Sequence, residues 1–184
     1  MSARTEQLES LGLLAAHEAA MADFYSALGA RFPERADLFS TLVSAERDHA
    51  RRITDFAALV SAGTVRVDPG RFPTAALLAS LDSIGEEIRR ARAPTVTLLE
   101  ALSVAYELES RLIESRYYEV VEGDSAEMKE LVEGLARELA EHRALLERAR
   151  EDASIRPAAA FCLLRHNSAS GLVLPRAAAS ASFT

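Results

Sequence analysis

The sequence has no tryptophan and only one cysteine, Cys162. A single cysteine cannot form a disulfide within the chain, so nothing in the sequence indicates an oxidising compartment. It also excludes the small metal-binding modules that are built on four cysteines or on a set of cysteines and histidines. Any metal site must therefore use other side chains.

Long apolar runs and an excess of basic residues are absent as well. No apolar run approaches the ~20 residues of a membrane span, and the N-terminus lacks the apolar core of a signal peptide. The formal net charge is −7, which argues against a nucleic-acid partner because phosphate binding needs a basic surface. We therefore expect a cytoplasmic protein that has neither a membrane nor a nucleic acid as its partner.

The residues that are abundant favour helices around one core. The chain has 184 residues, of which 49% are hydrophobic and only 6% aromatic. This length suits one domain with room for a tail. The core must be built mainly from leucine, alanine and valine, and stretches rich in alanine, leucine, glutamate and arginine favour helix.

Glycine and proline divide the chain into five predicted helices. These span residues 5–31, 33–61, 74–91, 94–122 and 125–153, and Gly63 is expected to end the second. The connections near Pro33 and Gly123 are short, which forces antiparallel neighbours. The two long pairs are joined by a crossover that contains the short third helix. The sequence therefore predicts an all-α fold, an antiparallel four-helix bundle with ferritin-like connectivity.

The composition changes near residue 154. Residues 1–153 are expected to form the bundle. Residues 154–184 contain Pro157, Pro175 and a run of alanine and serine at 177–182. We expect this segment to be a C-terminal tail that is either flexible or docked on a surface.

Polar residues interrupt the core-facing side of the second helix. We call the side chains that repeat in steps of three and four residues on one helix face its seam. Only two members of this seam are polar, and they form a Glu-x-x-His pair that projects from one face. Burying an unpaired carboxylate costs several kcal/mol, and a metal ion could compensate for it. The seam consists of Phe39, Leu42, Glu46, His49, Ile53, Phe56 and Val60.

The other long helices show the same interruption. The first and fourth helices each place one glutamate, Glu18 and Glu109, in an apolar seam, and the last places His142 there. Within each half of the chain, the glutamate precedes the loop and the histidine follows it by a similar distance. An antiparallel hairpin would bring both to a similar depth, so side chains from four helices could converge.

These residues resemble the rubrerythrin-type, ferritin-like di-iron family, over residues 5–153 and without its rubredoxin module. The likeness lies in four stretches, at residues 18–25, 45–49, 106–109 and 139–142. In such proteins, one glutamate comes from each of two helices and a Glu-x-x-His from each of the other two. The resemblance implies the metal ligands Glu18, Glu46, His49, Glu109 and His142.

The fourth of these motifs departs from the family pattern. Leu139 stands where a glutamate is expected, three residues before His142. Glu138 and Glu141 flank the position, but each residue turns the side chain by about 100° around the helix. Five of six implied ligands are present, and the missing carboxylate would weaken the binding of a second metal ion.

The resemblance also implies a function. Iron is the expected cofactor, as a di-iron or mononuclear site, with manganese as a further possibility. The implied chemistry is that of an oxidoreductase, a peroxidase or ferroxidase-like reaction of ferrous iron with peroxide or dioxygen. Without a rubredoxin module, electrons would come from a separate donor or from ferrous iron itself. Such proteins form homodimers or larger assemblies.

An alternative follows from Leu139. A degenerate bundle would bind one metal ion or none and act as a structural or interaction protein, with its buried groups satisfied by glutamate–histidine pairing. For the neighbouring residues we expect His17 at the surface. We expect Tyr25 and Tyr106 in core packing, with hydrogen bonding to the ligands as the alternative. Tyr118 is expected to be a packing or surface residue.

Overall fold

The computed structural model describes residues 3–65, 67, 72–114, 118 and 124–167. No strand occurs among these residues, which confirms the predicted all-α class. None of their helices is both long and apolar enough to cross a membrane. The elements are α1 (Ala3–Arg31), the 3₁₀ turn η1 (Pro33–Arg35), α2 (Ala36–Ala62), α3 (Thr74–Ala91), α4 (Leu98–Glu114) and α5 (Ala126–Asn167).

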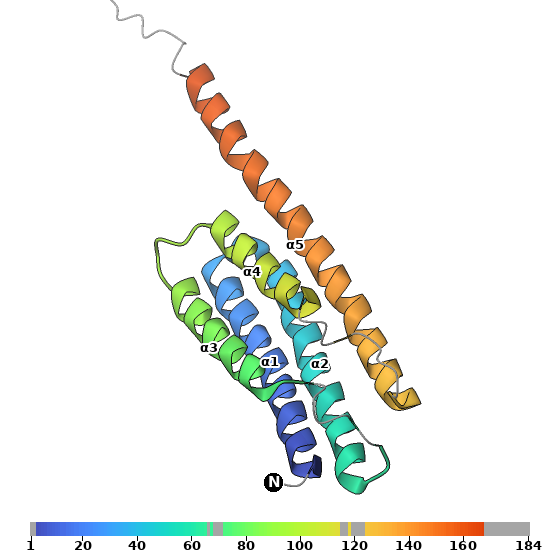
Figure 1. Cartoon of the computed structure of the whole chain (residues 1–184). Coiled ribbons are helices and arrows are strands. Elements are labelled where there is room, and N and C mark those ends of the chain that lie inside the picture. The colour runs from blue at the N-terminus through green and yellow to red at the C-terminus, as the bar shows by residue number, and fades with distance from the viewer. Residues whose placement is uncertain (1–2, 66, 68–71, 115–117, 119–123, 168–184) are drawn as a thin grey trace, which may run out of the picture.

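The helices pack mainly as two pairs. α1 lies along α2 and also along α3, while α4 packs on α5, and α2 and α5 bring the pairs together. The chain turns back between α1 and α2 through η1, so these two helices are antiparallel (Figure 1). Because α3 returns the chain to the opposite end, α2 and α4 run in the same direction (Figure 1). The helices α1, α2, α4 and α5 thus enclose a common interior.

The end of α2 has the predicted glycine. Gly63 adopts a left-handed conformation with φ of 78°. Its amide donates to the carbonyl of Val60, and the amide of Thr64 donates to that of Leu59. This pair of bonds satisfies carbonyls that a helix end leaves without partners. The position of Gly63 as the end of the second predicted helix is therefore confirmed.

The start of α4 differs from the prediction. The helix begins at Leu98, whereas the sequence analysis places its start at Pro94. The side chain of Glu100 accepts hydrogen bonds from the amide and hydroxyl of Thr97, and the Thr97 hydroxyl accepts one from the amide of Glu100. This reciprocal capping fixes the helix start more strongly than the proline does. The predicted end near residue 122 lies outside the described residues.

The end of α5 also differs from the prediction. The sequence predicts an end near Ala153, but α5 continues to Asn167. The continuation is rich in alanine and leucine, which favour helix enough to carry it past the proline at position 157. The rest of the predicted tail, residues 168–184, lies outside the described residues.

The interior consists of two apolar clusters with a polar layer between them. One cluster includes Leu14, Ile53 and Leu135, and the other includes Phe24 and Phe39. Every predicted seam residue of α2 is buried. The residues that repeat in the same steps around His142 in the last helix are buried as well, namely Val132, Leu135, Leu139, Leu146 and Ala149. In α4 the residue in the same series at the helix start, Leu99, is 39% exposed, because the helix begins only one residue before it. The side chain of residue 113 lies outside the described part.

Candidate metal centre

The five predicted ligands converge in the polar layer. Each has at most 5% of its surface exposed. They form two groups of three that could hold a metal ion, and within each group the ligand atoms lie within 4.8 Å of one another. Glu46 belongs to both groups. The first group is Glu18, Glu46 and His49, and the second is Glu46, Glu109 and His142.

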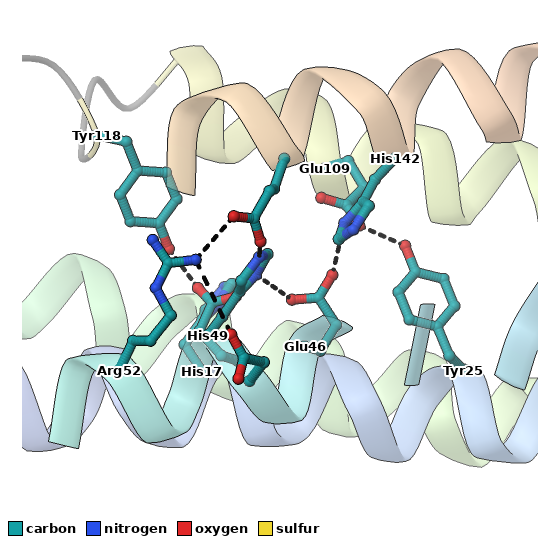
Figure 2. A network of polar contacts seen from close by, with 11 residues as sticks. His17, Tyr25, Glu46, His49, Arg52, Glu109, Tyr118 and His142 are labelled. Carbon is teal, nitrogen blue, oxygen red and sulfur yellow. Dashed lines mark hydrogen bonds and ion pairs between the residues drawn. The ribbon is translucent and has the colours of Figure 1, made fainter. Parts of the chain in front are cut away.

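Glu46 stands between the two histidines. Its Oε2 lies 3.1 Å from Nδ1 of His49, and its Oε1 lies 2.9 Å from Nδ1 of His142. The two imidazole rings are stacked with their centroids 5.4 Å apart. Figure 2 shows the carboxylate of Glu46 between the rings, with one oxygen directed at each. Glu46 is therefore common to both groups that could hold a metal ion.

A second glutamate completes each half of the site. Oε2 of Glu18 lies 3.6 Å from Nδ1 of His49, and Oε1 of Glu109 lies 3.6 Å from Nδ1 of His142. Both histidines therefore direct Nδ1 toward one glutamate of their own and toward the shared Glu46. The two halves repeat the same set of ligand types, as the similar spacing of the residues in the sequence predicts.

Several buried atoms of the site lack hydrogen-bond partners. Within the described part of the chain these include Oε1 of Glu46, Oε2 of Glu109 and Nδ1 of His142. The atoms of Glu46 and His142 are close but are not aligned as a hydrogen bond. Buried polar atoms are rarely left without partners because desolvation costs free energy. Carboxylate oxygens and an imidazole nitrogen that lack partners and lie this close together fit a metal ion.

Electrostatic interactions shift the pKa values of the histidines. Burial disfavours the imidazolium of His49, but the carboxylates of Glu18 and Glu46 outweigh this effect and raise its pKa to about 11. Burial likewise opposes the charge of His142, and Glu109 with Glu46 raises its pKa to about 9. Without a metal, both rings are therefore protonated near neutral pH and neutralise the carboxylates.

The pKa values of two site carboxylates move in opposite directions. Burial and the negative charge of Glu109 raise the pKa of Glu46 to about 7, although both histidines oppose this shift. Burial also acts on Glu18, but the neighbouring His17 and His49 hold its pKa well below the ordinary value. Glu46, in the centre of the negative charge, is thus the carboxylate that gains most from a cation.

Two buried tyrosines contact the glutamates of the site. The Tyr25 hydroxyl donates to Oε1 of Glu109 at 2.6 Å, and the Tyr118 hydroxyl donates to Oε1 of Glu18. Burial and the nearby carboxylates raise the pKa of both phenols well above the ordinary value, so they remain donors. The sequence predicts core packing for Tyr25, with hydrogen bonding to a ligand as the alternative, and the structure shows both burial and the hydrogen bond. For Tyr118 the sequence predicts packing or the surface, and the structure adds a hydrogen bond to the site.

His17 is buried, contrary to the prediction of a surface role. Only 2% of its surface is exposed. Its Nε2 lies 2.9 Å from the Ser80 hydroxyl of α3, and its Nδ1 lies 3.5 Å from Oε1 of Glu18. α3 covers the face of α1 that carries His17. The sequence did not show which face the crossover helix would cover.

The position of the missing sixth ligand is apolar. Leu139 is buried and packs in the apolar cluster that includes Ile53 and Leu135. The adjacent Glu138 points to a different part of the site, where its Oε2 lies 2.8 Å from Nε2 of His49. This contact is to the outer nitrogen of the ring, so Glu138 does not replace the missing carboxylate as a ligand in this arrangement.

Comparisons with family models, curated proteins and solved structures find no match for the chain. The seam interruptions in the sequence are the signal that predicts the five candidate ligands, and the structure brings these five side chains together. His17, Tyr118 and Glu138 lie off the seams, so their places depend on how the helices and connections pack.

Proposed function

We propose that the chain is a ferritin-like, rubrerythrin-type bundle that binds iron between its helices and uses it in reactions with peroxide or dioxygen. The observation that carries this proposal is the position of Glu46, whose two oxygens face His49 and His142. The order of the helices, with two antiparallel pairs joined through α3, supports the ferritin-like assignment.

The ligand types favour iron or manganese. Carboxylates and imidazoles suit these metals, whereas thiolates would favour zinc or copper. Glu18 with His49 would hold one ion, Glu109 with His142 the other, and Glu46 would bridge them. Three carboxylates leave part of the charge and coordination of two divalent ions unfilled. A metal held in this way would supply the chemistry with peroxide or dioxygen.

The surroundings of the site suit a reaction that excludes bulk water. Apolar clusters lie on both sides of the polar layer, and they limit the side reactions of an oxidant. Tyr25 and Tyr118 hold Glu109 and Glu18 in place through hydrogen bonds. When bound, iron supplies the electrons for reduction of the oxidant. Further electrons come from a separate donor or from additional ferrous iron.

Leu139 favours a second candidate function. With one bridging carboxylate absent, the bundle would hold one metal ion or none and serve as a structural or interaction protein. In that state, the protonated histidines pair with Glu46, Glu18 and Glu109, as the distances of 2.9–3.6 Å allow. The two functions differ in how much metal the protein retains.

Anaerobic loading with Fe(II), followed by removal of unbound metal and measurement of iron per chain, tests the proposal. We expect the natural protein to retain iron and Glu46→Ala to lose most of it, because that change removes a ligand from both groups. Glu107→Ala is the matched control, since Glu107 is an exposed glutamate of α4. Circular dichroism confirms that each variant is folded.

Addition of hydrogen peroxide or dioxygen to the loaded protein tests the chemistry. We expect consumption of the oxidant with oxidation of the bound iron, and little of either in Glu46→Ala. A natural protein that remains free of metal after exposure to Fe(II), Mn(II) and Zn(II) would contradict the proposal and favour the structural role.

A further inference from the structure

The two histidines of the site differ at their outer nitrogens. Nε2 of His49 lies 2.8 Å from Oε2 of Glu138, while its Nδ1 faces Glu46 and Glu18. A neutral imidazole carries one N–H, and the hydrogen bond at one nitrogen decides which nitrogen keeps its electron pair free. If Nε2 donates to Glu138, Nδ1 offers its electron pair to a metal ion.

Glu138 is itself held in place by Arg52. Nη1 of Arg52 donates to Oε1 of Glu138 at 2.8 Å. Arg52 follows His49 by three residues on α2, so both side chains project toward α5. Figure 2 shows the guanidinium of Arg52 reaching across from α2. The contacts therefore form a chain from Arg52 through Glu138 to the outer nitrogen of His49.

A glycine makes room for this chain of contacts. Gly134 precedes Glu138 by one helical turn on α5 and is buried. A β-carbon at Gly134 would collide with the guanidinium of Arg52. Glycine in the interior of a helix lowers stability by about 0.5–1 kcal/mol relative to alanine. Here it leaves the space that Arg52 needs in order to reach Glu138.

The second ligand on this side of the site is anchored as well. Oε1 of Glu18 accepts a hydrogen bond from Tyr118 and lies 3.5 Å from Nδ1 of His17. Its other oxygen, Oε2, remains directed at His49. Glu18 and His49 belong only to this group, because Glu46 is shared. Both are therefore held in orientation by residues that are not candidate ligands.

The other group has fewer outer contacts. Among the described residues, no side chain forms a hydrogen bond with Nε2 of His142. Glu109 receives a hydrogen bond from Tyr25 on Oε1, which is the oxygen nearer to His142, while its Oε2 lacks a partner. The ligands of this group are less restricted in orientation than those around His49.

We propose that the two metal positions are unequal, and that the position of Glu18, Glu46 and His49 fills first because Glu138 orients His49. This inference rests on the proposed function, since it assumes that the site binds metal. Glu138 and Arg52 act as positioning residues, because they contact a ligand rather than the ion. Glu138, which is adjacent to Leu139, thus strengthens the metal position around His49. It does not supply the carboxylate that is missing at Leu139.

A titration with Mn(II), followed by the electron paramagnetic resonance signal of the free ion, measures the two affinities. We expect two binding steps in the natural protein. Glu138→Ala should weaken the first step about 10–100-fold, the range typical for loss of such an outer partner, and leave the second step unchanged. Glu138→Gln keeps an acceptor for the His49 N–H and should weaken the first step less.

Two further variants separate positioning from general effects. Gly134→Ala should displace Arg52 and weaken the first step although no ligand is altered. Glu141→Ala, at an exposed glutamate of the same helix, should change neither step. Circular dichroism verifies the fold of each variant, and Glu138→Gln is the test that keeps the volume of the side chain if Gly134→Ala fails to fold.

The nitrogen signals of the histidine rings report the tautomer directly. With one equivalent of Zn(II), we expect His49 to show a metal-bound Nδ1 and a protonated Nε2 in the ¹⁵N spectrum. In Glu138→Ala this pattern should give way to a mixture of forms. A merely structural role of Glu138 would leave the tautomer unchanged.

The outcomes distinguish the two proposals. A protein that binds no Mn(II) or Zn(II) overturns both the proposed function and the order of filling. Binding in two equal steps, first binding at His142, or a Glu138→Ala variant that behaves like Glu141→Ala overturns the inference alone and leaves the proposed function standing.

Discussion

Glu46 belongs to both groups of residues that could hold a metal ion. It interrupts the seam of α2, and both of its oxygens are used, one for each histidine. Burial and the charge of Glu109 raise its pKa to about 7. Leu139 is its counterpart on α5, since it precedes His142 by three residues as Glu46 precedes His49. The composition of the site therefore depends on these two positions.

Substitution of Leu139 by glutamate should raise the affinity for metal and lower the stability of the metal-free protein. Loss of the buried leucine and burial of another carboxylate should destabilise the metal-free form by about 3 kcal/mol. Urea unfolding with and without Mn(II) measures both effects. Leu139→Gln is the control, because it loses similar packing without adding a charge. Equal metal affinity in the two variants would show that position 139 does not face the metals.

At the residue scale, the sequence predicts the candidate ligands but not the positions of His17 and Tyr118 beside them. Glu18, Glu109 and His142 could be found because steps of three and four residues place them among apolar side chains of one face. His17 could not be found in this way, since it follows from the packing of α3 on α1. Tyr118 lies in the connection between α4 and α5, whose path has no periodic signal.

At the scale of elements, α2 is the helix whose features follow most fully from the sequence. It supplies Glu46, His49 and Arg52, and its predicted seam is buried throughout. Its end at Gly63 follows from the sequence because glycine tolerates a positive φ. The predicted start of α4 at Pro94 is wrong because the capping pair Thr97 and Glu100 fixes the helix start. The predicted end of α5 near residue 153 is wrong because a change in composition does not by itself end a helix.

The role of Gly63 in ending α2 can be tested by alanine substitution. Gly63→Ala should destabilise the protein by about 1–2 kcal/mol, since a β-carbon is unfavourable at φ of 78°. The β-carbon would also lie 3.0 Å from the guanidinium of Arg4. Thermal or urea unfolding measures the change.

Gly12→Ala is the matched control with the opposite sign. Gly12 lies within α1, and a β-carbon there would meet nothing within 4 Å. We expect the free energy of unfolding to increase by about 0.5–1 kcal/mol. If both variants shifted the free energy of unfolding in the same direction, the left-handed conformation of Gly63 at the end of α2 would not explain the effect of Gly63→Ala.

At the scale of the whole molecule, the charged layer divides the interior into two apolar clusters. Without metal, this layer is held by protonated histidines. The all-α class could be predicted from composition and helix length, and the packing of α1 with α2 from their short loop. The side of the bundle that α3 covers depends on contacts between distant residues, which local patterns do not encode.

The metal-free protein should lose stability as the pH rises above neutral. The pKa values of His49 and His142 are raised to about 11 and about 9, above the value of about 6.5 in an unfolded chain. Their contribution is therefore fully present below about pH 6.5 and is lost as the pH rises through 9 and then 11. The raised pKa of Glu46 acts in the same direction between about pH 4.5 and 7.

Urea unfolding in the presence of a chelator, at several pH values from 6.5 to 9, measures this loss. We expect the free energy of unfolding to fall by at least about 1 kcal/mol between pH 7 and pH 9. His142→Gln should show a smaller fall, because it removes one of the groups that titrate. A stability that is constant or rises over this range would contradict the paired, protonated state of the histidines.

The hydrogen bonds of the two buried tyrosines give the protein its own optical reporter. The chain has four tyrosines and no tryptophan, so tyrosine emission is not obscured by an indole. Tyr25 and Tyr118 donate to Glu109 and Glu18, one on each side of the polar layer. A change at either side of the site alters the environment of one phenol. Ultraviolet fluorescence of the unlabelled protein can therefore follow the occupancy of the site.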